Sequence, residues 1–86
     1  MINLKLVTFE GDNTQFLVNA EHKNEAIAYA NESNIQVGEM YDSDYDLHNF
    51  KDEWYTVEDV DWNLLQEIIR RDDYLFTTSN AVVFKD

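Results

Sequence analysis

The stretch INLKLVTFEGDNTQFLVNA, residues 2–20, has the pattern of a β-hairpin, and the rest of the fold can be built outward from it. Apolar and polar residues alternate from Ile2 to Phe9, as they do in a half-buried strand. The turn residues EGDN follow at Glu10–Asn13. A second alternating run at Thr14–Ala20 completes the pair. Its apolar face carries Phe16, Val18 and Ala20.

The pattern then changes period. EHKNEAIAYANESN, Glu21–Asn34, is rich in helix formers and predicts a helix that ends at Asn34. Its narrow apolar stripe consists of Ala26, Ile27 and Ala30. IQVGEMY, Ile35–Tyr41, returns to apolar alternation and predicts a strand with a bulge at Gly38.

A second helix is predicted within TVEDVDWNLLQEIIRRDD, Thr56–Asp73. Two starts are open for it. Thr56 with Asp59 has the spacing of a capping box, whereas Asp61 is an equally good cap for a shorter helix. One helical face carries Val57, Val60, Leu64 and Ile68, and Leu65 and Ile69 widen that face.

The last segment, YLFTTSNAVVFKD, predicts two short strands around Ser79 and Asn80. The order is therefore β-β-α-β, an acidic segment, then α-β-β. It indicates an α+β fold in which a mainly antiparallel sheet is packed on one side by two helices. With 86 residues and no proline-rich or glycine-rich linker, residues 1–86 form a single small domain.

Charge limits the classes of partner. Eighteen acids against six bases give a formal net charge of −12. This charge disfavours direct binding to nucleic acid or to an anionic membrane, and it favours basic proteins or cations. A hydrophobic fraction of 44% with twelve aromatic residues predicts a folded core. The absence of cysteine, of a signal peptide and of a long apolar run predicts a cytoplasmic protein.

The acids are concentrated between Glu39 and Trp62, which hold nine of the eighteen, together with six aromatic residues and one base. Part of this segment resembles a calcium loop. Asp42 at the first loop position is followed at suitable positions by Asp44, Asp46, His48 and Glu53. Leu47 stands where an EF-hand loop requires glycine, and Asn49 stands at a usually aliphatic position. Weak calcium binding is therefore one hypothesis for this segment, and it stands third beside the two functions described below.

Catalytic chemistry has little support in the sequence. His22 and His48 are the only histidines, and the three serines lie in polar, turn-like surroundings without a nucleophile elbow. Carboxylates are so numerous that chance pairs are expected, so their proximity is poor evidence for acid–base catalysis. We predict a protein that is not an enzyme and has no cofactor and no dedicated metal site.

The remaining interpretation treats the acids as charges displayed to a partner. On an extended segment, Asp42, Asp44 and Asp46 would project about 6.6 Å apart, of the same order as the charge spacing along a nucleic-acid strand, about 3.4 Å of axis per phosphate. The predicted partner-binding residues are Asp42, Asp44, Asp46, Asp52, Glu53, Glu58, Asp59 and Asp61 for charge, and Tyr45, Trp54 and Tyr55 as aromatic anchors. A solvated acidic face without a dedicated partner is the plain alternative.

YDSDYD (41–46) and KDEWYTVEDVD (51–61), in a small acidic chain without cysteine, resemble the nucleic-acid-mimicking inhibitors of phages and mobile elements. That class includes anti-restriction and anti-CRISPR proteins. The resemblance implies an inhibitor that occupies the basic nucleic-acid-binding groove of a host nuclease or defence complex, without catalysis. The alternative is a small interaction or assembly module of a phage or mobile element. Such a module would associate, also as a homodimer, through an unpaired strand edge such as AVVF, Ala81–Phe84.

Overall fold

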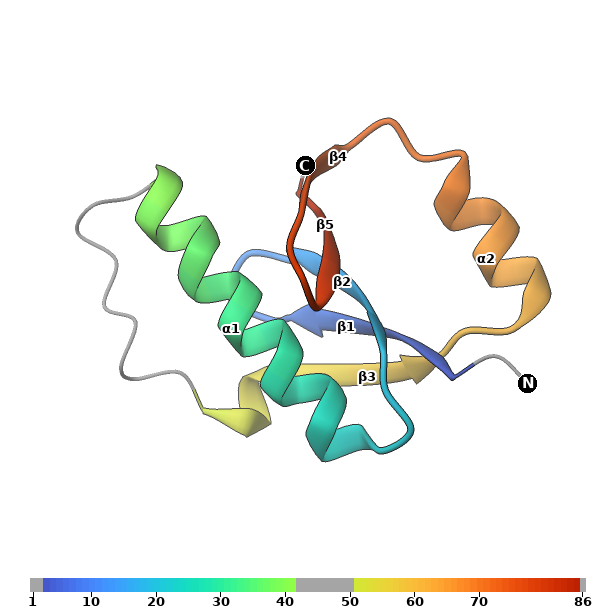
Figure 1. Cartoon of the computed structure of the whole chain (residues 1–86), viewed down its shortest axis with the longest axis horizontal. Coiled ribbons are helices and arrows are strands. Elements are labelled where there is room, and N and C mark those ends of the chain that lie inside the picture. Colours follow the sequence, from blue (N-terminus) through green and yellow to red (C-terminus); the bar gives the residue numbers. More distant parts are fainter. Residues whose placement is uncertain (1–2, 42–50, 86) are drawn as a thin grey trace.

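The computed structural model describes residues 3–41 and 51–85 of the chain. In this part, five antiparallel strands form one sheet and two helices pack against it, which confirms the predicted α+β class (Figure 1). A short 3₁₀ helix, η1, precedes the third strand. The elements are β1 (Leu4–Phe9), β2 (Gln15–Asn19), α1 (Lys23–Tyr41), η1 (Asp52–Trp54), β3 (Tyr55–Asp59), α2 (Trp62–Ile69), β4 (Tyr74–Thr77) and β5 (Ala81–Phe84).

The strands lie in the order β3-β1-β2-β5-β4, with every neighbouring pair antiparallel. The predicted β1–β2 hairpin is confirmed, and so are the two short strands predicted around Ser79 and Asn80, which are β4 and β5 and pair with each other. Register partners form one row across the whole sheet, and side chains in a row share a face. This row consists of Glu58, Leu6, Leu17, Val82 and Thr77. The edge strands are β3 and β4. The prediction that Ala81–Phe84 is an unpaired edge is wrong, because β5 lies between β2 and β4.

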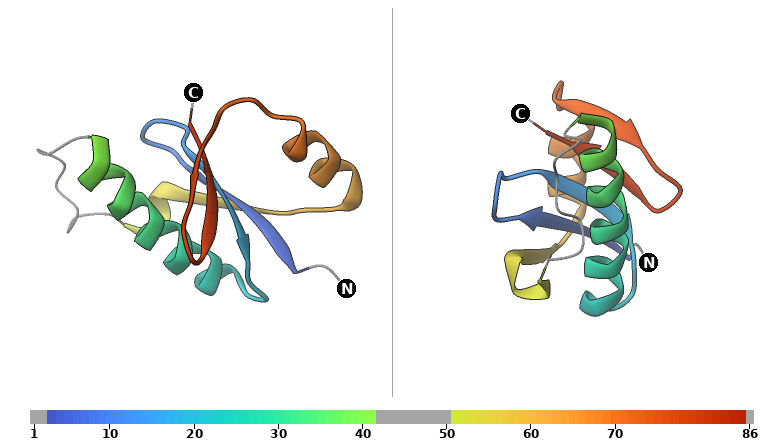
Figure 2. Two further views of the ribbon diagram at one scale, coloured as in Figure 1. Left: turned by 45° about the horizontal axis from the view of Figure 1, so that its top comes forward. Right: turned by 90° about the vertical axis from the view of Figure 1, so that its left-hand side faces the viewer.

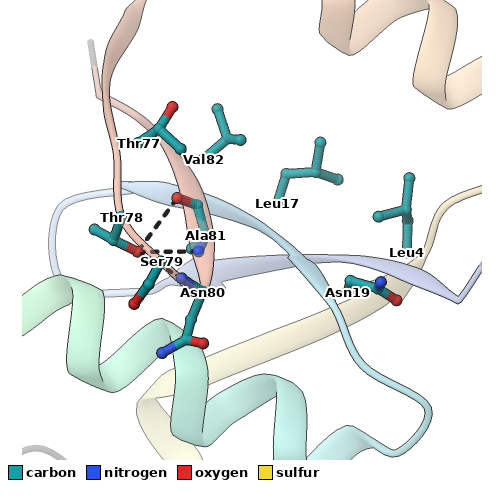
Figure 3. A pocket seen from close by; sticks show the side chains of 9 residues that line it. All are labelled: Leu4, Leu17, Asn19, Thr77, Thr78, Ser79, Asn80, Ala81 and Val82. Atoms are coloured by element: carbon teal, nitrogen blue, oxygen red, sulfur yellow. Dashed lines mark hydrogen bonds between the residues drawn. The ribbon is translucent and has the colours of Figure 1, made fainter.

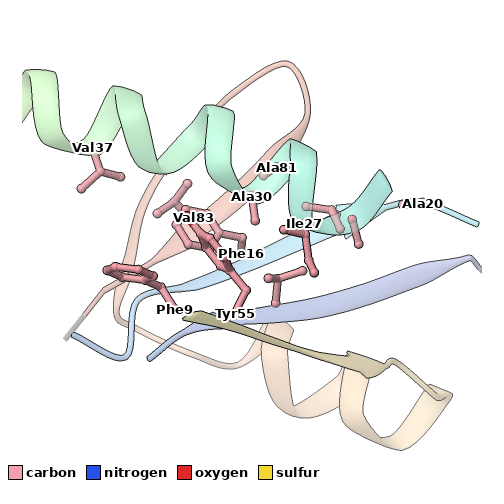
Figure 4. Packing of buried hydrophobic residues seen from close by; sticks show 12 residues of the cluster. Phe9, Phe16, Ala20, Ile27, Ala30, Val37, Tyr55, Ala81 and Val83 are labelled. Carbon is pink, nitrogen blue, oxygen red and sulfur yellow. The ribbon is translucent and has the colours of Figure 1, made fainter. Parts of the chain in front are cut away.

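The main core lies between α1 and one face of the sheet, as Figure 4 shows. Alternation along the strands places every second apolar side chain on this face. Val7, Phe16 and Val83 are fully buried there, and Val18 is nearly so. The predicted inward face of the second strand is confirmed, since Ala20 belongs to the same cluster.

Helix α1 runs from Lys23 to Tyr41, so the predicted strand at Ile35–Tyr41 is wrong. Asn34 does not end the helix. Its side chain is buried and donates from Nδ2 to Tyr55 Oη at 3.0 Å. Val37 continues the buried stripe one turn beyond Asn34. Gly38 is therefore a helical residue and not a strand bulge. No helix of the described residues is long and apolar enough to cross a membrane.

The second predicted helix is correct only in its shorter form. Residues from Tyr55 to Asp59 form the strand β3, so the predicted capping box at Thr56 is wrong. Tyr55 and Val57 alternate onto the α1 face, and this period of two is what the interpretation as a helix overlooked. Helix α2 begins after Asp61, whose Oδ1 accepts the backbone N–H of Leu64 at 2.8 Å.

The two helices lie on opposite faces of the sheet, and the prediction that both pack on one side is wrong (Figure 2). Leu6 and Phe84 point away from α1 because they alternate with Val7 and Val83. They form a second, smaller cluster with Val60 and Ile68 of the α2 segment. The sheet is therefore covered by a 19-residue helix on one face and an 8-residue helix on the other.

Candidate partner-binding surface

Five exposed carboxylates lie close together along the chain at the β3 edge of the sheet. We call Asp52, Glu53, Glu58, Asp59 and Asp61 the acidic edge. Its first two members sit on η1, the next two on β3, and the last caps α2. The segment is anchored by the β1–β3 ladder and by the Glu10 N–H, which donates to the Trp54 carbonyl at 2.8 Å. The fold thus fixes the backbone from which these acids project.

Two members of the acidic edge already have structural partners. Asp59 pairs with Lys5 of the neighbouring strand at 2.9 Å, although the aspartate side chain remains 87% exposed. Asp61 accepts the cap hydrogen bond of α2. Asp52, Glu53 and Glu58 form no ion pair with any base of the described residues. Within the acidic edge, these three carboxylates are the ones that no cation of residues 3–41 and 51–85 neutralises.

The carboxylates of β3 project to both sides of the strand. Glu58 is the register partner of Leu6 and shares the α2 face, whereas Asp59 is the partner of Lys5 and lies on the α1 side. The described acids of β3 therefore do not form a single-faced row, and the row predicted for Asp42, Asp44 and Asp46 lies outside the described residues. Because β3 is an edge strand, both side chains still reach solvent. The charge is displayed by the edge of the sheet and not by either face.

The two aromatic residues predicted here as anchors differ in exposure. Trp54 is 37% exposed, and Lys51 Nζ lies 5.9 Å from the centre of its ring. Tyr55 is only 4% exposed, so its prediction as a partner-binding anchor is wrong. Its ring packs against Phe9 at 5.2 Å between centroids, and its hydroxyl donates to Asn31 Oδ1. Tyr55 is a core residue because its strand position faces α1.

Several predicted residues lie outside the described part of the chain. They include the calcium-loop positions up to Asn49, so the calcium hypothesis stays a prediction. Glu53, the twelfth position of that loop, is exposed on η1. Among residues 3–41 and 51–85, no three acidic or histidine side chains gather closely enough to hold a metal ion. The predicted partner-binding residues that also lie outside are Asp42, Asp44, Tyr45 and Asp46.

A second line of acids lies on α1 and was not predicted from the sequence. Three exposed acids follow one another at intervals of seven residues, namely Glu25, Glu32 and Glu39. This interval places them on one side of the helix, with about 10.5 Å between successive residues. Glu32 accepts a hydrogen bond from Asn80 Nδ2 at 2.8 Å, so this line runs beside the β4–β5 turn. The spacing was visible in the sequence, but Ile35–Tyr41 was interpreted as a strand.

An apolar surface on the α2 side was also missed. We call Leu4, Leu17, Ile69, Tyr74 and Val82 the apolar patch. It borders two hollows, of about 240 and 310 Å³, that share Leu17 and Val82. In Figure 3, Leu4, Leu17 and Val82 point to the same side of the sheet, into the first hollow. In the sequence, this surface is indicated by Ile69, which makes the apolar stripe of α2 wider than its contact with the sheet requires.

Comparison of the chain with protein-family models, with curated proteins and with solved structures finds no match. The acidic edge and the apolar patch therefore have to be interpreted from their own chemistry.

Proposed function

We propose that this chain is a non-enzymatic acidic inhibitor that occupies the basic nucleic-acid-binding groove of a partner protein. The partner class is a nuclease or defence complex in the cytoplasm of a host cell, such as a CRISPR effector or a restriction enzyme. The observation that carries the proposal is the acidic edge, where Asp52, Glu53 and Glu58 are exposed and lack an ion-pair partner among the described residues.

The negative charge of the acidic edge is complementary to a groove lined with lysine and arginine. With a formal net charge of −12, the chain attracts a basic surface over long range, and uncompensated carboxylates at the contact replace phosphates as the anions. Trp54 lies beside Asp52 and Glu53, and its exposed ring adds the apolar contact that charge alone does not supply. Binding of this kind is fast and weakens as salt screens the charges.

The proposal is tested by affinity capture from host lysate at low and high salt, with the captured protein identified by mass spectrometry. The test variant reverses three acids, Asp52→Lys, Glu53→Lys and Glu58→Lys. Asp59 and Asp61 are left unchanged because they support β3 and α2. A matched control reverses Glu39, Glu67 and Asp72, which are exposed elsewhere. Each reversal adds two charges to −12, so both variants have a formal net charge of −6.

We expect the acidic-edge variant to lose the captured protein while the control retains most of it. Equal losses in the two variants would show that only total charge matters, and they would remove the acidic edge from the mechanism. Retention by both variants at high salt would contradict charge-based binding altogether. Circular dichroism and urea unfolding of each variant establish that the fold is intact.

A second candidate function is a small interaction or assembly module of a phage or mobile element. It is favoured by the exposed side chains of the apolar patch, where Ile69 is 71% and Tyr74 54% exposed. This function would operate through the apolar patch and not through the acidic edge. The two candidates therefore predict different sensitive residues and different responses to salt.

A further inference from the structure

The apolar patch is only partly covered by α2. This helix has eight residues, and Leu4, Leu17 and Val82 remain half-buried beside it (Figure 3). Ile69 at the end of α2 is 71% exposed and borders the second hollow, which has Leu17 and Val82 in its lining. A large exposed apolar side chain beside a concave apolar floor is typical of an interface. The surroundings of the patch indicate the kind of partner that fits it.

One side of α2 leads from the acidic edge to the apolar patch. Trp62 directly follows Asp61, the last member of the acidic edge, and is 62% exposed. It precedes Ile69 by seven residues, which places both side chains on the same side of the helix, about 10.5 Å apart. The half-buried Leu65 lies between them on that side. We call Trp62, Leu65 and Ile69 the α2 strip.

The sheet beside α2 provides a second connection between the acidic edge and the apolar patch. Leu4 lies on β1, the neighbour of β3, and its carbonyl accepts the N–H of Val60 at 3.0 Å. Val60 stands between Asp59 and Asp61 of the acidic edge. Val82 lies on β5, three strands from β3, or about 14 Å at the usual strand spacing of about 4.8 Å. A single segment of a partner is therefore long enough to contact both surfaces.

The charge around the Trp62 end of the α2 strip is negative. Residues 58–66 contain three acids and no base, namely Glu58, Asp59 and Asp61. Asp59 is paired with Lys5, and the other two form no ion pair with a base of residues 3–41 and 51–85. A lysine or arginine of the partner is attracted by these carboxylates, and it can also lie over the exposed indole ring of Trp62. This end of the strip is suited to a base.

The charge at the Ile69 end of the strip is different. Glu67 lies two residues before Ile69, about 200° around the helix, so it points away from the hollow. Arg70 and Arg71 follow Ile69, and Arg71 is paired with Asp73. Among the described residues that line the two hollows, Arg71 is the only charged one. The arginines repel a base at this end, and the apolar lining favours an apolar side chain.

We propose that the α2 strip and the apolar patch bind one segment of the basic partner, with lysine or arginine at one end and a large apolar side chain at the other. The basic end lies at Trp62 beside Asp61, and the apolar side chain enters the hollow over Leu17 and Val82. The two ends of the segment are about 10 Å apart, as the ends of the α2 strip are. This inference rests on the proposed function, and it adds an apolar contact that salt does not screen.

Two synthetic peptides of equal charge test the inference. Both begin with the same short run of lysines, which leucine and phenylalanine follow in one peptide and glycine and serine in the other. The acidic edge attracts both alike, because their charges are equal. We expect the apolar peptide to bind the full chain at least about tenfold more tightly, as measured by isothermal titration calorimetry at about 150 mM salt. It should also shift the NMR signals of Trp62 and Leu17.

The variants Ile69→Ser and Trp62→Ser should each reduce this preference to less than about threefold, because each removes one end of the α2 strip. Ile69→Leu should retain the preference. Asn63→Ser is the matched control, since Asn63 is exposed on the same helix about 120° away from Ile69, and the preference should not change. Trp62 and Ile69 are mostly exposed, so their variants should keep the fold, and the urea unfolding midpoints check this.

Equal binding of the two peptides would overturn the inference. So would a preference that persists in Ile69→Ser, or NMR shifts confined to the acidic edge. Self-association of the free chain that Ile69→Ser abolishes, as measured by sedimentation equilibrium, would show that a second copy occupies the patch instead.

These outcomes are distinguishable from failure of the proposed function, because the peptides are defined probes and require no captured protein. A chain that prefers the apolar peptide but does not compete with nucleic acid would keep this binding site and lose its role in nucleic-acid mimicry. A chain that competes with nucleic acid but binds both peptides equally would keep the proposed function and lose this inference.

Discussion

The two faces of the sheet are built from neighbouring residues of the same strands, yet they are buried to different degrees. Phe16 and Val83 point to α1 and are fully buried, whereas Leu17 and Val82 point to α2 and remain half-buried. The difference comes from the lengths of the covering helices, 19 residues against eight. It indicates that the α1 face provides most of the stability and that the α2 face has apolar surface left for recognition.

The sharpest test of this division compares Phe16→Ala with Leu17→Ala. Phe16→Ala leaves a cavity in a closed core and should lower the free energy of unfolding by about 3–5 kcal/mol. Leu17→Ala removes a side chain that already borders a hollow, so we expect a loss of only about 1–2 kcal/mol. Urea unfolding measures both. Equal losses would mean that the α2 face is as tightly packed as the α1 face.

A smaller effect is expected at Tyr55, on the α1 side of β3. Tyr55→Phe removes the hydroxyl that donates to Asn31 and accepts from Asn34, and it leaves the buried Asn34 amide and the half-buried Asn31 amide without this partner. We expect a loss of about 1–3 kcal/mol in the free energy of unfolding. Capture of the partner should not change, because Tyr55 is a core residue. If partner binding were lost while stability stayed the same, Tyr55 would be an interface anchor after all.

The smallest effect concerns Asp12 in the β1–β2 turn, which belongs to neither face. Burial raises the pKa of Asp12, but the hydrogen bonds from Thr14 and Lys85 outweigh burial and hold the pKa below its ordinary value of 3.8. The ionised carboxylate therefore stabilises the fold above pH 3.8, and this contribution is lost as the pH falls through the lowered pKa. Asp12→Asn should therefore reduce the difference between the free energies of unfolding at neutral and at acidic pH, as measured by urea unfolding. An unchanged difference would contradict this role.

The sequence was sufficient to predict the elements in which the spacing of the apolar residues matches the side that is buried. The hairpin up to Ala20 and the strands around Ser79 could be predicted because each has a single alternating or turn pattern. The region after Asn34 could not be predicted from its pattern. Asn34 looks like a helix stop, but it and Ser33 are buried polar residues that form hydrogen bonds outside the helix, with Tyr55 and Thr78. These hydrogen bonds to distant parts of the chain stabilise both residues within α1.

The candidate site was predictable in its charge but not in its geometry. The acids at Asp52 and Glu53 stand out in the sequence, and the structure places them on the surface. Tyr55 was misjudged because its exposure depends on which face of β3 meets α1, and the segment from Thr56 was interpreted as a helix. The apolar patch joins residues from β1, β2, α2, β4 and β5, so its existence depends on the order of the strands in the sheet.

The central claim is that the acidic edge takes the place of nucleic acid on a basic partner. The most direct measurement is competition between this protein and labelled DNA or RNA for the captured partner, at about 50 and 200 mM salt. We predict that the protein displaces the nucleic acid, that displacement weakens at least about tenfold at the higher salt, and that the variant reversing Asp52, Glu53 and Glu58 does not compete. A partner that binds both at once, or that is displaced equally well by this variant, would contradict the account.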